Sequence, residues 1–233
     1  MLQRLLWKLL PKEQRQFLLN LLPAEQRQLV NKVMSDRARF PSYFRERRCL
    51  FIHVPKCAGS SIRTALFDGQ RPGHLPLYWY EQQFPREYTE SFKFAFVRDP
   101  LERAYSAYTY LSHRGVASRD HSARLLVERY TSFDEFVSHW LHPENLHKQL
   151  HFVPQSTFLC DAMGHLAMDF IGRQERLAED FQKLCQIMSW QVELPHRNVS
   201  RKSSSPAHEC CSSRTRRLVR RAYQRDYQML GYD

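Results

Sequence analysis

The stretch CLFIHVPKCAGSSIRTAL, residues 49–66, constrains the fold more than any other part of this 233-residue chain. A short, mostly apolar run leads into a turn of small residues and then into helix-forming spacing. A buried strand followed by a tight turn and a helix is typical of an α/β sheet. The first amides of such a helix favour negative charge. We therefore expect an anion beside Gly59, Ser60 and Ser61.

The place of the lysine distinguishes this turn from the common phosphate-binding loop. In the pattern GxxxxGK[ST] the lysine follows the glycines, whereas Lys56 precedes Gly59. A small-residue turn that holds no ligand is the alternative that this stretch, taken alone, leaves open. The predicted anion cradle consists of Lys56, Cys57, Ala58, Gly59, Ser60 and Ser61.

A second anion site is predicted where another strand ends. The apolar run FKFAFV, residues 92–97, leads into RDPLERAYSAYTYL, where Asp99 can cap a helix and Pro100 can occupy its first turn. Arg98 leaves the carboxyl end of this strand, and Ser106 lies two turns into the helix on the same face as Asp99. Arg98 and Ser106 are therefore predicted to hold a second anionic group, with a structural ion pair of Arg98 as the alternative.

Strands that alternate with helices indicate the fold class. A third apolar run, residues 167–172, precedes a helix expected over 177–188, so we predict an α/β protein with a P-loop-type, mostly parallel sheet flanked by helices. Residues 113–150 are expected to form a helical cap over this sheet. Helical spacing returns at 214–230, and its arginines are interpreted as a solvated face, with an anion-binding face as the alternative.

The N-terminal region contains an internal repeat. LLPKEQRQFL, residues 9–18, recurs as LLPAEQRQLV, residues 21–30, and each proline suits the first turn of a short helix. We predict a helical extension over 1–45, followed by one main domain over 46–233. The helices are expected to pack on that domain or on a second copy, with contact of residues 1–40 with a membrane surface as the alternative.

Composition points to an anionic partner and a reducing compartment. The formal charge of +11 rests mainly on arginine, which suits bidentate contacts to phosphate, sulfate or carboxylate. The six cysteines show no CxxC pair and no regular secreted framework. No apolar run approaches the length of a membrane span, and no signal-peptide pattern is present at the N-terminus. We expect a cytoplasmic protein, with peripheral membrane attachment as the alternative.

The two anion-site segments together carry a family resemblance. HVPKCAGSS followed by FVRDPLERAYSAY resembles the paired signature of sulfotransferases that use 3′-phosphoadenosine 5′-phosphosulfate (PAPS). With the later VPQ, DFIGRQERLAEDF and LPHRNVSR, the chain is similar over residues 48–232 to the carbohydrate branch that includes chondroitin, dermatan and heparan 2-O sulfotransferases. The resemblance implies sulfuryl transfer from PAPS to a hydroxyl of a carbohydrate or glycoconjugate, with 3′-phosphoadenosine 5′-phosphate as product.

The resemblance also implies how the nucleotide is held. The cradle around Lys56 would take the 5′-phosphosulfate, and Arg98 with Ser106 would take the 3′-phosphate. In the family a loop near the C-terminus closes on the nucleotide. In this sequence that loop offers Ser200, Arg201 and Lys202.

Catalysis requires a base for the acceptor hydroxyl, and histidine is the usual choice near neutral pH. His74, in QRPGHLPLYWYEQ, is chosen because its context is similar to the Gly-His stretch of the heparan 2-O branch; a loop histidine without catalytic duty is the alternative. Lys56 and the loop amides are predicted to stabilise the leaving group. Gln155 and Glu175 are predicted to orient acceptor or cofactor, with an exposed ion pair as the ordinary reading of Glu175.

No metal ion is predicted, because a sulfuryl group carries one fewer negative charge than a transferring phosphoryl group. A zinc site of His139, His142, His147 and His151 is disfavoured, since Pro143 interrupts their helix and no cysteine or carboxylate shell is evident. The expected partner is a carbohydrate or glycoconjugate acceptor, anionic or neutral, and no nucleic acid. A P-loop kinase for a small hydroxylated substrate and a non-catalytic binder of anionic saccharide remain alternatives.

Overall fold

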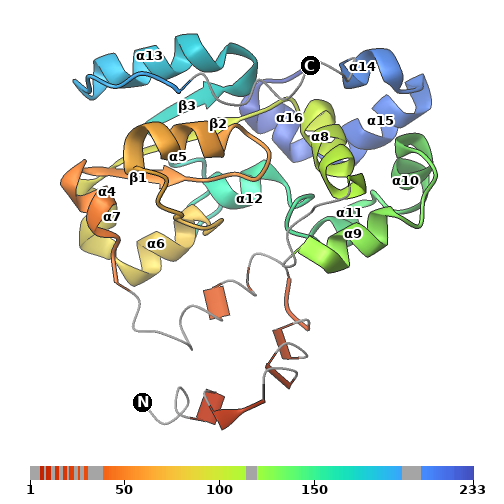
Figure 1. Ribbon diagram of the computed structural model, residues 1–233, viewed down its shortest axis with the longest axis horizontal. Coiled ribbons are helices and arrows are strands. Elements are labelled where there is room, and N and C mark those ends of the chain that lie inside the picture. The colour runs from red at the N-terminus through yellow and green to blue at the C-terminus, as the bar shows by residue number, and fades with distance from the viewer. Residues whose placement is uncertain are drawn as a thin grey trace.

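A computed structural model of the chain describes residues 39–113, 120–195 and 206–233, together with scattered positions among residues 1–38. Three parallel strands form one sheet in the order β1-β2-β3, with helices around it (Figure 1). The predicted α/β class, with a parallel sheet flanked by helices, is confirmed. The strands are β1 (Cys49–Ile52), β2 (Phe92–Val97) and β3 (Phe170–Arg173).

Figure 1 shows α13 on one side of the sheet and α6 with α12 on the other. The described helices, in chain order, are α4 (Ser42–Glu46), α5 (Gly59–Phe67), α6 (Leu77–Gln83), α7 (Pro85–Glu90), α8 (Pro100–Ser112), α9 (His121–Val127), α10 (Phe133–His139), α11 (Pro143–Leu146), α12 (Gln155–Leu159), the 3₁₀ helix η2 (Gln174–Arg176), α13 (Leu177–Ile187), α14 (Ala207–Cys210), α15 (Ser213–Ala222) and α16 (Gln224–Leu230).

The strand register brings three loops to one edge of the sheet. Ile52 pairs with Ala95, and Val97 pairs with Arg173. All four residues of β1 are buried, as expected for a strand covered on both faces. Because the strands are parallel, the segments that follow β1, β2 and β3 meet at their shared carboxyl edge. This edge positions the candidate site.

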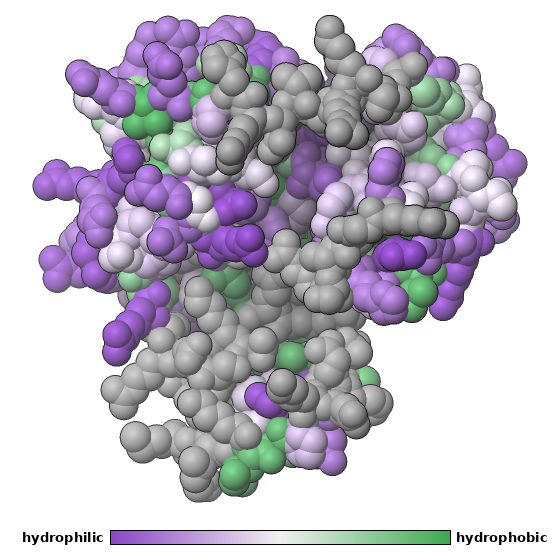
Figure 2. Space-filling view, viewed as in Figure 1, coloured by the Kyte–Doolittle hydropathy of each residue, from purple (hydrophilic) through white to green (hydrophobic). Residues whose placement is uncertain are grey.

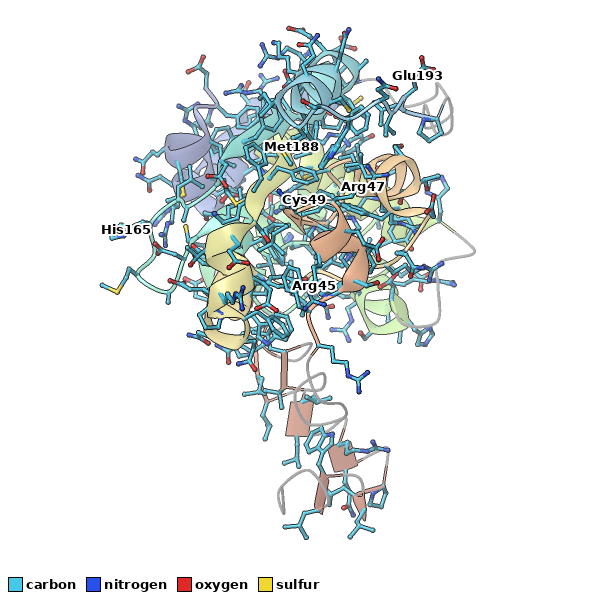
Figure 3. All side chains as sticks on the ribbon, turned by 90° about the vertical axis from the view of Figure 1, so that its left-hand side faces the viewer. Arg45, Arg47, Cys49, His165, Met188 and Glu193 are labelled. Atoms are coloured by element: carbon cyan, nitrogen blue, oxygen red, sulfur yellow. The ribbon has the colours of Figure 1, made fainter. Side chains whose placement is uncertain are left out.

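The opposite edge of the sheet is a structural region. Figure 3 looks onto the side of the molecule where β1 begins, with Arg47 beside Cys49. The Arg47 guanidinium lies 5.5 Å from the ring centroid of Trp190, and Cys49 is fully buried. The six cysteines, all of them among the described residues, form no disulfide.

The segment before β3 differs from the sequence prediction. A strand was expected over 167–172, whereas β3 begins at Phe170. The backbone N–H of Ala167 donates to the carbonyl of Leu159 at 3.4 Å, so this segment is tied to the end of α12 instead of to β2. Pairing with β2 starts where Asp169 donates its N–H to the Lys93 carbonyl.

The predicted cap over the sheet is also wrong. The helices α9, α10 and α11, within residues 113–150, pack with α8, α14 and α15 around a second core beside the sheet (Figure 1). Phe136 and Phe152, both fully buried, meet in this core with ring centroids 5.0 Å apart. The aromatic residues of this region therefore pack against α8 and not against the strands.

The C-terminal helical segment divides into two helices at Tyr223. The Tyr223 hydroxyl is buried and donates to the carbonyl of Phe152 at 2.8 Å, so the chain turns there. Asp99 caps α8 by accepting the Glu102 N–H, and Pro100 is in the first turn, which confirms the prediction for that helix.

Two fully buried charged residues connect α8 and α16 to the chain at and just before the start of α12. The guanidinium of Arg103, in α8, donates to the carbonyls of His151 and Val153 at 3.3 and 2.7 Å. The carboxylate of Asp226, in α16, accepts the N–H groups of Gln155 and Ser156 at 2.7 and 2.8 Å. Asp226 thereby satisfies the first amides of α12, which have no intrahelical acceptor.

The extension predicted over 1–45 is described in part. Helical positions occur at 6–7, 14–15 and 29–30, and Leu29 joins the main core. The boundary near residue 45 and the membrane contact of residues 1–40 stay predictions.

Replacing Asp226 by alanine should destabilise the fold by about 3 kcal/mol, because two buried N–H groups lose their acceptor. Urea unfolding measures this change. The control is Glu179→Ala, which removes an exposed carboxylate from a helix surface and should change stability by less than about 0.5 kcal/mol. Equal stabilities of the two variants would contradict the proposed role of Asp226.

Candidate active site

The turn after β1 has an unusual backbone that suits an anion. Lys56 and Ala58 both adopt positive φ angles, +68° and +58°, although neither is glycine. Such residues cost of order 1 kcal/mol each and concentrate at functional sites. Left-handed residues that alternate with ordinary ones turn successive N–H groups toward one side, which forms an anion-binding nest. The nest continues into the first turn of α5, whose N-cap is Ala58 with no side-chain cap.

Gly59 is required by the close approach of His53. A Cβ atom at residue 59 would lie 2.0 Å from two atoms of the His53 ring, a separation that no real structure tolerates. His53 also stacks on Phe51, with ring centroids 5.5 Å apart. The structure therefore places His53 as a packing residue beneath the loop.

His74 lies beside His53, next to the same loop. Its Nδ1 is 2.7 Å from the carbonyl oxygen of His53, and the two imidazole rings are 4.3 Å apart. A carbonyl accepts only, so Nδ1 carries a proton and the lone pair of the neutral ring lies on Nε2. The fold thus brings the predicted base to the predicted anion cradle, from a separate segment of the chain.

Lys56 is largely enclosed, and its ammonium lies 4.1 Å from the centroid of the Tyr110 ring. Burial, followed by the nearby charge of Arg98, lowers the pKa of Lys56 to about 8. The effect of the Arg98 charge means that Lys56 and Arg98, which are far apart in sequence, lie near each other at the carboxyl edge of the sheet. Tyr110 was not predicted as a site residue; its place in α8, one turn beyond Ser106, was the available signal.

Arg98 follows β2 and has an unsatisfied donor. Its Nε is buried and has no hydrogen-bond partner among the described residues, while its Nη2 lies 3.5 Å from Glu102 Oε2. The weak ion pair with Glu102 is the structural alternative that the sequence left open, and it leaves the Nε donor unused. Ser106 is half-buried on α8. An oxyanion at this point would satisfy the guanidinium.

Gln155 joins the two predicted anion sites through its buried carboxamide. Its Oε1 accepts the Arg98 N–H at 3.0 Å and the Cys57 thiol at 3.3 Å, and its Nε2 donates to the Arg98 carbonyl at 2.7 Å. Burial raises the pKa of the Cys57 thiol to about 12, so it remains a neutral donor. Direct contact of Gln155 with a ligand stays a prediction; in the structure the side chain holds the residues that surround the site.

Glu175 has a similar position after β3. Its Oε1 accepts the Asp99 N–H at 2.6 Å, and its Oε2 accepts the Tyr232 hydroxyl at 3.2 Å. It therefore connects the end of β3 with the start of α8 and with the C-terminus. The role of orienting acceptor or cofactor stays a prediction for this residue.

The predicted closing loop lies outside the described residues, which include none of Ser200, Arg201 and Lys202. The segment that follows it returns beside the predicted second anion site. There the Ala207 N–H donates to Glu102 Oε1 at 2.7 Å, and Glu102 is also the neighbour of Arg98. The contact between Glu102 and Ala207 was not predicted from the sequence, because the two residues are distant along the chain.

The arginines of α15 have mixed surroundings. Arg216 donates to the His208 carbonyl at 2.7 Å, and Arg220 lies 5.2 Å from the Tyr227 ring. An open groove of about 380 Å³ between α15 and α16 is lined by Arg217, Arg220 and Arg221. Both readings of this helix, solvated face and anion-binding face, stay predictions.

The described part of the chain contains no cluster of three or more His, Cys, Asp or Glu side chains placed to hold a metal ion. The histidines of the zinc alternative have other neighbours. His139 Nδ1 lies 2.9 Å from the Glu135 carbonyl, and His151 lies 3.2 Å from Asp120.

Comparison with known proteins identifies the family. Residues 43–233, most of the chain, match the model of the sulfotransferase family. No curated protein matches the chain. Among the described residues, no helix is long and apolar enough to cross a membrane. The match spans the loop after β1, the Arg98 segment and the helices between and beyond them, and the chain therefore belongs to the sulfotransferase family, whose members transfer sulfuryl groups.

Proposed function

We propose that the protein transfers a sulfuryl group from PAPS to a hydroxyl of a carbohydrate or glycoconjugate. The observation that carries this proposal is the pair of basic anion sites at neighbouring strand ends, joined by Gln155. One site has a nest, a helix N-terminus and Lys56, and the other has Arg98 with an unsatisfied Nε. PAPS presents two separate anionic groups and fits such a pair.

The chemistry of the donor set supports PAPS over a nucleoside triphosphate. The residue after Gly59 is Ser60, where a kinase-type loop has its lysine. Arg98 follows the strand adjacent to β1, which supports a second anion apart from the one at the loop rather than the extension of a single phosphate chain. Figure 2 shows a recessed, hydrophilic surface between α5 and α8, the helices that follow the two sites.

The chain's own residues account for the proposed mechanism. PAPS supplies the sulfur electrophile and a diphosphate leaving group. The acceptor hydroxyl would give its proton to His74 Nε2, because Nδ1 is committed to the His53 carbonyl. Lys56 and the first amides of α5 would stabilise the charge that develops on the departing oxygen. Because the loop amides are already oriented, they need not rearrange when this charge develops. Such preorganised dipoles lower the activation free energy of the transfer.

A non-catalytic saccharide binder is less well supported. Such a protein would need neither a strained loop, with two non-glycine residues at positive φ, nor a histidine held in one tautomer beside it. The carbohydrate acceptor is proposed from the resemblance of the motifs and from the basic character of the chain, whose formal charge is +11. The acceptor position that receives the sulfate is left for experiment.

The affinity for 3′-phosphoadenosine 5′-phosphate should depend on the charge of Lys56. Because the pKa of Lys56 is lowered to about 8, the free enzyme holds this proton below that pH and loses it above. A bound phosphate favours the ammonium, so affinity should be constant below pH 8 and fall by up to about tenfold per pH unit above it. Calorimetric titration from about pH 6.5 to about 9.5 measures this dependence.

The control is Lys56→Arg, whose side chain stays charged throughout this range. This variant should bind with an affinity that does not fall above pH 8. If wild type and Lys56→Arg lose affinity in parallel, the charge of Lys56 is not the cause and its assignment to the cradle fails.

Removal of the base should separate catalysis from binding. With sulfur-labelled PAPS and a panel of hydroxylated acceptors, His74→Ala should lose at least about a hundredfold in turnover. Its affinity for 3′-phosphoadenosine 5′-phosphate should stay within about threefold of wild type, because the proposed cradle consists of Lys56 and the loop amides and does not include His74. His165→Ala, on a side chain that is 76% exposed and extends from the surface of the molecule, is the matched control (Figure 3). Full turnover in His74→Ala would overturn the assignment of His74 as the base. The proposed function would be overturned if the wild-type protein neither binds PAPS nor transfers sulfate to any acceptor of the panel.

A further inference from the structure

The Lys56 ammonium rests against an aromatic face. Its Nζ lies 4.1 Å from the centroid of the Tyr110 ring, well within the range of a cation–π interaction. Tyr110 belongs to α8, the same helix that carries Ser106 one turn earlier. One helix therefore contributes to the second anion site and contacts the cation of the first.

The Tyr110 ring is itself held in place from behind. Its hydroxyl donates to Asp120 Oδ2 at 3.0 Å, and His151 Nε2 lies 3.2 Å from the other carboxylate oxygen. The side chains of Asp120 and His151 are each only 12% exposed, and the His151 ring lies 5.6 Å from the Tyr110 ring. A ring anchored at its hydroxyl presents one fixed face to Lys56.

The charges around Lys56 show why such a face matters. Burial and the positive charge of Arg98 favour loss of the Lys56 proton, whereas the carboxylate of Asp120 favours its retention. His151, whose Nε2 lies 3.2 Å from Asp120 Oδ1, is the other titratable group that faces this carboxylate. The negative face of the ring attracts the ammonium and not the neutral amine. The ring therefore also favours retention of the Lys56 proton.

We propose that Tyr110 is a positioning residue for sulfuryl transfer, whose ring holds the charged Lys56 side chain at the phosphate loop before the nucleotide binds. This inference rests on the proposed function of Lys56 and adds a residue to it. A flexible lysine that is already placed loses less conformational freedom when the anion arrives, which strengthens binding.

Fluorination of the ring tests the electrostatic part of this role. Every member of a phenylalanine series lacks the Tyr110 hydroxyl, so the effect of the fluorines is measured within the series, where the shape of the ring is nearly constant. Phenylalanine and its mono-, di- and trifluorinated analogues are incorporated at residue 110, and the affinity for 3′-phosphoadenosine 5′-phosphate is measured by calorimetry. Affinity should fall stepwise along the series, by about tenfold in total, because each fluorine weakens the negative face. In the Lys56→Ala background the same series should be flat.

Tyr110→Leu, which removes the ring, should also lower the pH above which affinity declines, by up to about one unit. A series that is flat with Lys56 present, or equally steep in Lys56→Ala, overturns the proposal. An unchanged pH midpoint in Tyr110→Leu overturns it as well.

A readout without nucleotide keeps this inference separate from the proposed function. NMR of lysine labelled with ¹³C at its ε carbon follows the titration of Lys56, and the Lys56→Arg spectrum identifies its signal. The pKa of Lys56 should decrease along the fluorinated series even if the nucleotide does not bind. A pKa that stays constant along the series contradicts the role of Tyr110, whereas a wild type that binds no nucleotide contradicts only the proposed function.

Discussion

The buried carboxamide of Gln155 is the interaction on which the site depends. It accepts from the Cys57 thiol in the phosphate loop and from the Arg98 N–H at the end of β2, and it returns a donor to the Arg98 carbonyl. A loop with two residues at positive φ would otherwise be free to relax. Since Asp226 fixes the backbone of Gln155 from α16, the loop geometry is supported by the whole fold.

Under the proposed function, this arrangement gives a small sheet two places for a ligand with two separate anionic groups. Strand β1 pairs in parallel with β2, and the Gln155 carboxamide forms hydrogen bonds to the segments that follow both strands. Lys56 and Arg98 are then close enough for the charge of one to lower the pKa of the other, an unfavourable pairing that a bound anion would reverse. Under the proposed function, relief of this repulsion by the anion would add to the affinity for the ligand.

Much of this could be predicted from the sequence, because local signals dominate strands, turns and caps. The strand predicted over 92–97 has the same bounds as β2, and the start of α8 at Asp99 and Pro100 was predicted from capping chemistry. The second core could not be predicted, since aromatic residues such as Phe136 do not reveal which partner they pack against. The contact of Tyr110 with Lys56 and the hydrogen bonds of Gln155 to the loop were not predicted for the same reason, because the partners are distant along the chain.

The central claim is that two anion sites are held at a fixed separation, and two isomeric nucleotides test it directly. Adenosine 3′,5′-diphosphate and adenosine 5′-diphosphate carry the same groups, but only the first presents phosphates at both positions. Calorimetry should find the 3′,5′ isomer bound at least about tenfold more tightly, since it alone engages both Lys56 and Arg98. Equal binding, or tighter binding of the 5′-diphosphate, would contradict the account.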